Sequence, residues 1–129
     1  MVSQLLLDTT VLVDYLREQN AAVKYLEGLG AEHRLISAVT VAELYAGVRD
    51  GKERARLVKL LLAFDIVPVD REIAEKGGLY RRDYGPSHGT GLADAIIAAS
   101  AVARAATLVT GNQQHFPMLR DVHIPYRKA

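Results

Sequence analysis

Three acids and one amide are the residues of this sequence with the clearest chemical meaning. Asp8 comes directly after a short apolar run, and Asn112 belongs to the segment at 110–112 that directly follows another. Glu43 and Asp94 lie in the first turn of the helices expected near such runs. Three carboxylates and an amide oxygen form the hard oxygen set that Mg²⁺ or Mn²⁺ prefers, with waters in the remaining positions. Their mutual repulsion would be costly without a cation. An ion held in this way suits hydrolysis of a phosphodiester bond by a water that the ion activates.

These residues need a fold that brings them together, and the apolar pattern predicts one. The pattern changes period repeatedly, as alternating strands and helices require. Strands are expected at 4–7, 34–37, 66–69, 107–110 and 122–124, the third at an edge because of Pro68. Helices are expected at 10–17, from an Asn20 cap to a stop at Gly30, and at 40–48, 53–64, 70–84 and 92–104, with a loop at 85–91.

Strands separated by helices imply right-handed crossovers and a parallel sheet covered on both faces. The sequence therefore predicts an α/β fold, a three-layer α/β/α arrangement with a central parallel sheet. No linker or repeat divides the chain, so residues 1–129 are expected to form a single domain. In such sheets functional groups gather beyond the carboxyl ends of the strands, where all four polar residues are expected to meet.

Each of the four residues also has a purely structural interpretation. Asp8 and Asn112 can cap the segments that follow them. Thr40 and Glu43 fit the spacing of a capping box, and Asp94 suits the positive end of a helix dipole. Caps alone, however, do not require every acid to follow a strand at the same edge of the sheet.

Composition excludes several other classes of protein. The chain has no cysteine, which excludes disulfides, thiolate metal sites and a cysteine nucleophile. Sixteen Lys and Arg against fifteen Asp and Glu leave a net charge of +1, so any basic surface for a nucleic acid must be local. The N-terminus lacks the basic start of an export signal, and no apolar run is long enough for a membrane span. We therefore expect a cytoplasmic protein without a membrane partner.

Four segments carry a resemblance to a known family. They are LLLDTTVL at 5–12, SAVTVAEL at 37–44, DAIIAA at 94–99 and TGNQQHF at 110–116. In this order the segments resemble the successive motifs of PIN-domain ribonucleases, and specifically of the VapC toxins of type II toxin–antitoxin operons. The resemblance spans essentially the whole chain.

The resemblance implies a metal-dependent endoribonuclease. Asp8, Glu43 and Asp94 would bind Mg²⁺ or Mn²⁺, and Thr9 and Thr110 would support the site. RNA of the tRNA or rRNA class would be the substrate. The partners would be a cognate antitoxin, whose C-terminal tail covers the cleft, and a second copy of the chain in a homodimer.

One position departs from the family pattern, and it leaves one alternative function open. The fourth family position is often an acid, whereas Asn112 brings no charge, which leaves open a PIN-like RNA-binding module with weak catalysis.

A second alternative is an aspartate-based phosphotransfer protein, which would use Asp8 as the phosphate acceptor. However, residues 1–7 contain no acid, and Thr10 stands where a phosphatase would have a second Asp.

Further residues have weaker signals. Asp14 is expected to be a solvated helical acid rather than part of the cleft. His115 is expected near the site in a packing or capping role. The basic stretch at 49–59 fits either an RNA-backbone contact or a solvated helix face. The apolar residues of 10–29 and 53–64 exceed what one sheet face is expected to cover, which favours a two-fold dimer contact.

Overall fold

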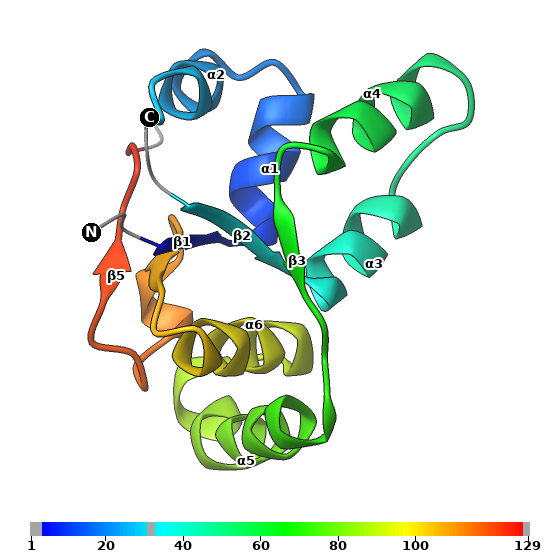
Figure 1. Ribbon diagram of the computed structural model, residues 1–129. Helices are drawn as coiled ribbons and strands as arrows, with labels where there is room; N and C mark the ends of the chain where they lie inside the picture. The colour runs from blue at the N-terminus through cyan, green and yellow to red at the C-terminus, as the bar shows by residue number, and fades with distance from the viewer. Residues whose placement is uncertain (1–3, 31–32, 128–129) are drawn as a thin grey trace.

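The computed structural model, which describes residues 4–30 and 33–127, is built around a parallel sheet (Figure 1). Its strands are β1 (Gln4–Leu7), β2 (His33–Ser37), β3 (Asp65–Val67), β4 (Thr107–Val109) and β5 (Val122–His123). The strand order is β3-β2-β1-β4-β5, and every neighbouring pair is parallel. The expected α/β fold with a central parallel sheet is confirmed, and β3 is an edge strand as Pro68 predicted.

Helices cover both faces of the sheet, which makes three layers (Figure 1). Helices α5 (Arg71–His88) and α6 (Leu92–Ala103) lie on one face. The other face carries α1 (Thr9–Leu16), α2 (Asn20–Glu27), α3 (Ala38–Ala46) and α4 (Lys52–Leu61). A short 3₁₀ turn, η1 (Gln113–His115), follows β4.

Alternation along the strands divides the core into two clusters. Leu6 of β1 belongs to the cluster that includes residues of α6, whereas its neighbour Leu7 belongs to the cluster that includes residues of α1. Leu108 and Val109 of β4 divide in the same way. Because successive strand side chains point to opposite faces, a continuous apolar run is what a strand buried on both sides needs.

Close contact between α5 and α6 depends on Gly77. A Cβ atom at this position would lie 3.0 Å from Ile96 Cγ1 and 3.2 Å from Ile96 Cα. A larger residue would push against backbone as well as side chain, so glycine permits this close approach. The contact sets the position of α6, the helix that carries Asp94.

Some helix boundaries differ from the sequence prediction. The cap of α2 is Gln19, whose side chain accepts a hydrogen bond from the Ala22 N–H at 3.2 Å, and the expected cap Asn20 is the first helical residue. The same helix ends at Gly28 rather than at Gly30.

The expected loop at 85–91 is mostly helix. Helix α5 continues through Pro86 to His88 and ends at Gly89, whose φ is +68°. Proline removes one backbone donor, but the Gly89 N–H still bonds to the Gly85 carbonyl at 3.0 Å and completes the last turn. The expectation that the helix ends at residue 84, before Pro86, is therefore wrong.

The expected excess of apolar residues is largely absorbed by the fold. Most of these residues are buried in, or packed against, the cluster beneath α1 and α4: Tyr15, Leu16, Tyr25, Leu26, Leu57, Leu60, Leu61 and Phe64. Val58 and Leu62 are the exceptions, with 48% and 83% of their surface exposed. The argument for a dimer from surplus apolar surface therefore reduces to these two residues and their surroundings.

A membrane-crossing helix is not found among the described residues, because none is both long enough and apolar enough.

Candidate active site

Asp8 lies at the carboxyl end of the central strand and is almost fully buried, with 2% of its surface exposed. It occupies the N-cap position of α1, but its side chain makes no capping hydrogen bond. Its Oδ2 atom instead accepts hydrogen bonds from Thr110 Oγ1 at 2.7 Å and Thr10 Oγ1 at 3.1 Å. Thr110 reaches Asp8 because β1 and β4 are neighbours, and the Asp8 N–H bonds to the Val109 carbonyl. The capping interpretation of Asp8 is therefore wrong.

Glu43 is held by a chain of hydroxyl groups. Thr9 Oγ1 donates to Glu43 Oε1 at 2.7 Å and lies 2.9 Å from Thr40 Oγ1. Since the single hydroxyl hydrogen of Thr9 points to Glu43, Thr40 must donate to Thr9. The fully buried Thr40 thus orients Thr9, which in turn orients the exposed Glu43 side chain.

The capping-box interpretation of Thr40 and Glu43 is also wrong. Helix α3 begins at Ala38 and is capped by Ser37, whose Oγ accepts from the Val39 N–H at 3.2 Å. Glu43 consequently lies in the second turn of the helix, not in the first. Sequence reasoning missed Thr40 as a site residue, although Ser37 was available as an earlier capping signal.

Asp94 reaches the same edge from α6. It lies in the first turn of that helix, as expected, and 28% of its side chain is exposed. Its Oδ2 is 3.4 Å from His115 Nδ1, and the backbone carbonyl of His115 accepts a hydrogen bond from Thr90 Oγ1 at 2.7 Å. His115 therefore lies within ion-pair distance of Asp94, which a role in packing alone would not require.

The acids influence one another electrostatically. Burial raises the pKa of Asp8, and the hydrogen bonds from Thr110 and Thr10 oppose this rise. Burial, followed by the negative charge of Asp8, raises the pKa of Asp94, and Glu43 contributes in the same direction. His115 lowers the pKa of both aspartates. The charges of Asp8 and Glu43 thus act on Asp94, and burial disfavours the charged forms of Asp8 and Asp94.

The donor set suits a divalent cation in charge and chemistry. Two buried or half-buried carboxylates and a third held by Thr9 offer oxygen ligands, and hard divalent cations bind oxygen. In residues 4–30 and 33–127, no three His, Asp or Glu side chains come close enough to form a complete metal-binding group. Asp8 and Asp94 are therefore the residues best placed to hold an ion, with Glu43 nearby.

Asn112 contributes through its backbone as well as its side chain. Its N–H donates to Thr110 Oγ1 at 3.0 Å, which orients the hydroxyl that bonds to Asp8. Its side chain does not cap η1, so the capping interpretation is wrong here too. The side chain lines a cavity beside the acids.

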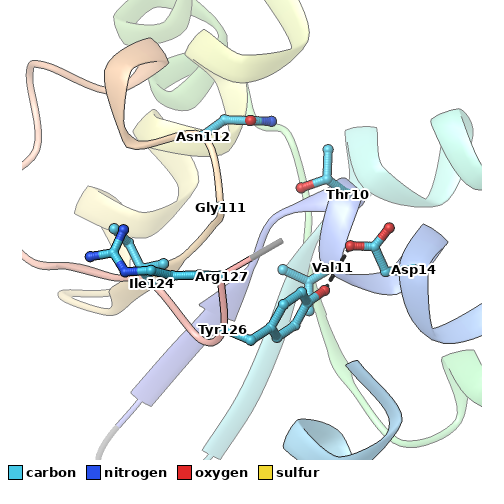
Figure 2. Close-up of a pocket in the computed structure, with 8 residues that line it drawn as sticks. All are labelled: Thr10, Val11, Asp14, Gly111, Asn112, Ile124, Tyr126 and Arg127. Atoms are coloured by element: carbon cyan, nitrogen blue, oxygen red, sulfur yellow. Dashed lines mark hydrogen bonds between the residues drawn. The ribbon is translucent and has the colours of Figure 1, made fainter. Parts of the chain in front are cut away.

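Asp14 is not solvated, contrary to the sequence prediction. It is buried at 8% exposure, and its Oδ2 accepts a hydrogen bond from the Tyr126 hydroxyl at 2.8 Å (Figure 2). The partner lies 112 positions away along the chain, so sequence spacing carried no signal for this pair.

A larger groove of about 700 Å³ extends from Glu43 along α1, α3 and α4. Its lining is both apolar and basic, the basic residues being Arg17, Arg49, Lys52 and Arg56. Part of the basic stretch identified in the sequence therefore lies beside the acids rather than only on a solvated helix face.

Comparisons with known proteins agree with this geometry. A family model described as PIN domain matches residues 5–120. The chain is 40% identical over 124 residues to Ribonuclease VapC19 of Mycobacterium tuberculosis, which covers 94% of this chain and 98% of that relative.

Two solved structures share the fold. A toxin–antitoxin complex from Klebsiella pneumoniae matches with a TM-score of 0.80 and 28% identity, over 95% of this chain and 98% of that one. FitAcB from Neisseria gonorrhoeae matches with a TM-score of 0.73 and 32% identity, over 94% of this chain and 97% of that one.

The raised pKa of Asp94 leads to a prediction about stability. A carboxyl whose folded-state pKa is raised binds its proton more tightly in the folded state, so its contribution to stability falls as pH rises above the unfolded value. In chelator at pH 7, Asp94→Asn should raise the melting temperature by about 3 °C, because it removes the cost of burying this charge and its repulsion by Asp8, together on the order of 1 kcal/mol. The difference should shrink as the pH is lowered through the titration of this carboxyl.

Thermal unfolding of the two proteins across pH measures this effect. Asp121→Asn is the matched control, since it removes the same charge from an exposed position and should leave the melting temperature unchanged. An Asp94→Asn protein that melts below the wild type at pH 7 in chelator would contradict the electrostatic description of the site.

Proposed function

The chain belongs to the PIN-domain family, and on this premise we propose that it is a metal-dependent endoribonuclease that acts as the toxin of a toxin–antitoxin pair. The observation that carries the proposal is the convergence of Asp8, Glu43 and Asp94, where the charges of Asp8 and Glu43 raise the pKa of Asp94. Relatives covering nearly the whole chain are named ribonucleases. We also propose a cytoplasmic location, because the proposed substrate is RNA.

The roles of the acids follow from their burial and partners. We assign Asp8 and Asp94 as direct ligands of Mg²⁺ or Mn²⁺, and Glu43 as a ligand directly or through water. When bound, such an ion supplies neutralisation of phosphate charge and a lowered pKa for a coordinated water.

The surrounding side chains orient these ligands. Thr110 and Thr10 fix one oxygen of Asp8, and the Asn112 N–H fixes the orientation of the Thr110 hydroxyl. Thr9 fixes one oxygen of Glu43. We assign the Asn112 amide the role of positioning a water or the ion, and these hydrogen bonds hold Asp8 and Glu43 in defined orientations before an ion binds.

The groove beside Glu43 provides a path for the RNA backbone. Arg17, Arg49, Lys52 and Arg56 line it and can contact phosphates on one side of the acids. Because the net charge of the whole chain is only +1, this local concentration of basic residues is significant. A folded RNA of the tRNA or rRNA class is the proposed substrate.

A second candidate is a PIN-like module that binds RNA and cleaves it weakly. It is favoured by Asn112, which supplies no charge at a position where the family often has an acid. RNA cleavage measured with and without divalent ions distinguishes the two candidates, because a module that only binds RNA does not need a divalent ion for its function.

The first prediction for this function concerns Asp94. Asp94→Asn should lower metal-dependent RNA cleavage by at least about 100-fold, because it removes a proposed ligand without changing side-chain size. Cleavage of a structured RNA by purified protein, with Mg²⁺, with Mn²⁺ and with chelator, measures this.

The exposed variant Asp121→Asn again serves as the control and should cleave at the wild-type rate. Cleavage by Asp94→Asn near the wild-type rate would exclude the proposed site, and cleavage in chelator would exclude the proposed cofactor.

We also propose that the chain forms a homodimer through the β3 edge of its sheet. Ile66 on β3 is 43% exposed, and Val58 and Leu62 expose apolar surface on the segment just before this strand. Light scattering at micromolar concentration should give the mass of a dimer, and Leu62→Glu should shift it toward a monomer because a charge cannot be buried there without a partner.

Val102→Glu is the matched control for this change. Val102 is also an exposed apolar residue, at 41% against 83% for Leu62, but it lies on α6 on the opposite side of the sheet. A monomeric wild-type mass would contradict the dimer, and a dimer that survives Leu62→Glu would exclude this edge as its interface.

The last prediction here concerns inhibition by the antitoxin. Lys and Arg are absent within three positions of Asp8, Glu43 and Asp94 in the sequence. A guanidinium can bind two carboxylate oxygens at once and replace the charge of the ion. We expect an Arg of the antitoxin's C-terminal tail to enter among these acids and compete with Mg²⁺ or Mn²⁺.

Inhibition measured across a metal titration, with this tail Arg changed to Ala in parallel, tests the competition. The antitoxin should inhibit less as metal concentration rises, and the Ala variant should inhibit weakly at all concentrations. Inhibition that depends on neither would show that the tail acts only by covering the RNA groove.

A further inference from the structure

Helix α5 carries two adjacent arginines, Arg81 and Arg82, on the opposite face of the sheet from the basic groove (Figure 1). The groove beside Glu43 is built from α1, α3 and α4. Glu43 reaches the site from α3 and Asp94 reaches it from α6, so the acids lie between the two helical layers. An RNA bound only in the groove would have phosphate contacts on one side of the acids alone. A cation on the α5 side would supply contacts on the other.

The two adjacent arginines have different surroundings. The Arg82 Nε atom lies 2.8 Å from Asp83 Oδ1, so this guanidinium already has a carboxylate partner. Arg81 is exposed, and within residues 4–30 and 33–127 its side chain makes no ion pair and no hydrogen bond. A guanidinium has five N–H donors in a fixed fork, which matches the oxygens of a phosphate. Of the two residues, Arg81 is the one whose donors are available to a ligand.

Gly85 allows the Arg81 side chain to extend toward the C-terminal end of α5. A Cβ atom at position 85 would clash with the Arg81 guanidinium, which therefore lies over the Gly85 backbone, one turn further along the helix. Long side chains on a helix more often lean toward its N-terminus. The same Cβ atom would lie 3.3 Å from the Thr90 carbonyl oxygen. The guanidinium therefore lies close to the connection between α5 and α6.

This connection leads directly to the acids. Thr90 Oγ1 donates to the His115 carbonyl at 2.7 Å, and His115 Nδ1 lies 3.4 Å from Asp94 Oδ2. Asp94 itself lies in the first turn of α6, four residues after Thr90. The Arg81 guanidinium is thus at the same end of the domain as the acids, on the side of α5.

Two aromatic rings lie near Arg81 on the last turns of α5. The Tyr84 and His88 ring centroids are 6.0 Å apart with their planes at 68°, which is an edge-to-face contact. Arg81, Tyr84 and His88 are three and four positions apart, so they share one face of the helix. Proteins that bind unpaired RNA combine cations for the backbone with aromatic rings for the bases. This combination favours RNA over an acidic peptide as the ligand.

We propose that the C-terminal end of α5 is a second RNA-contact surface, where Arg81 binds a phosphate of the substrate on the side of the acids opposite the basic groove. The proposal rests on the proposed ribonuclease function. Together the two surfaces hold the RNA backbone on both sides of the scissile phosphate. Because phosphates carry no sequence information, this contact adds affinity but no base preference.

The experiment measures binding of a fluorescently labelled structured RNA to the full chain by anisotropy, in chelator so that metal-dependent cleavage does not occur. Arg81→Ala should weaken binding by about 5-fold at low salt, because one exposed ion pair contributes up to about this much. Between about 50 and 200 mM salt, it should also reduce the slope of log affinity against log salt by about 0.7 to 0.9, the value for one lost phosphate contact.

Two further variants separate charge from position. Arg82→Ala removes the same charge from the adjacent residue, whose guanidinium is paired with Asp83, and should bind within about 1.5-fold of the wild type. Gly85→Ala keeps the net charge but displaces the Arg81 guanidinium, so it should weaken binding by about 3-fold. Thermal unfolding of all the variants verifies that the fold is retained.

The outcomes distinguish this surface from the proposed function. RNA affinity and salt slope unchanged in Arg81→Ala would overturn the surface and leave the ribonuclease function standing. Equal losses in Arg81→Ala and Arg82→Ala would show that only net charge matters, which would also overturn it. Normal RNA binding by Arg81→Ala with weaker antitoxin binding would assign the surface to the antitoxin instead. A wild type that binds no RNA would contradict both the surface and the proposed function.

Cleavage of the same RNA with Mg²⁺ or Mn²⁺ gives a second measurement. Arg81→Ala should raise KM by about 5-fold and change kcat by less than about 2-fold, because the contact is present both before and during cleavage. The loss should be the same for RNAs that differ in the bases flanking the cleaved bond. A fall in kcat at unchanged KM would place Arg81 at the reacting phosphate and contradict a contact remote from it.

Discussion

The buried carboxylate of Asp8 is the constraint around which this site is organised. A carboxylate with 2% of its surface exposed loses most of its hydration, and the rise in its pKa reflects this cost. Two hydroxyl groups compensate in part, one from Thr10 on the following helix and one from Thr110 after the neighbouring strand. Both are neutral, so neither cancels the negative charge of the Asp8 carboxylate, and a cation can bind there.

The parallel sheet makes this arrangement possible. Because β1, β2 and β4 run in the same direction, the residues after them emerge at one edge, with Asp8 and Thr110 side by side. Asp94 arrives at the same edge on α6, which packs against α5 through the close approach at Gly77. Neutral hydroxyl groups orient the acids, and basic residues stay in the adjoining groove. This separation keeps the acids available to an ion and the groove available to a phosphate backbone.

The groove beside Glu43 and the cavity beside Asn112 differ in the residues that line them. The groove next to Glu43 carries Arg and Lys, which suit phosphates and read no sequence. The cavity next to Asn112 is lined instead by the hydrogen-bonded pair of Asp14 and Tyr126, among other residues.

The sequence by itself determined the order of strands and helices along the chain and the residue types that form the candidate site. Apolar runs such as Leu5–Leu7 signal strands buried on both faces, and an acid directly after such a run is unusual enough to indicate a site. These features are local, so they can be read from neighbouring residues. The parallel sheet then followed from the alternation of strands and helices, and with it the expectation that Asp8, Glu43 and Asp94 lie at the same edge of the sheet.

Only the tertiary structure decided how these residues are held. The bond from Thr110 to Asp8 and the bond from Tyr126 to Asp14 join residues more than one hundred positions apart, and no local pattern encodes such pairs. The role of Thr40 depends on α3 beginning at Ala38, a boundary set by the Ser37 cap rather than by helix periodicity. Local sequence fixes residue type and the order of elements, whereas burial and hydrogen-bond partners arise only when distant segments pack together.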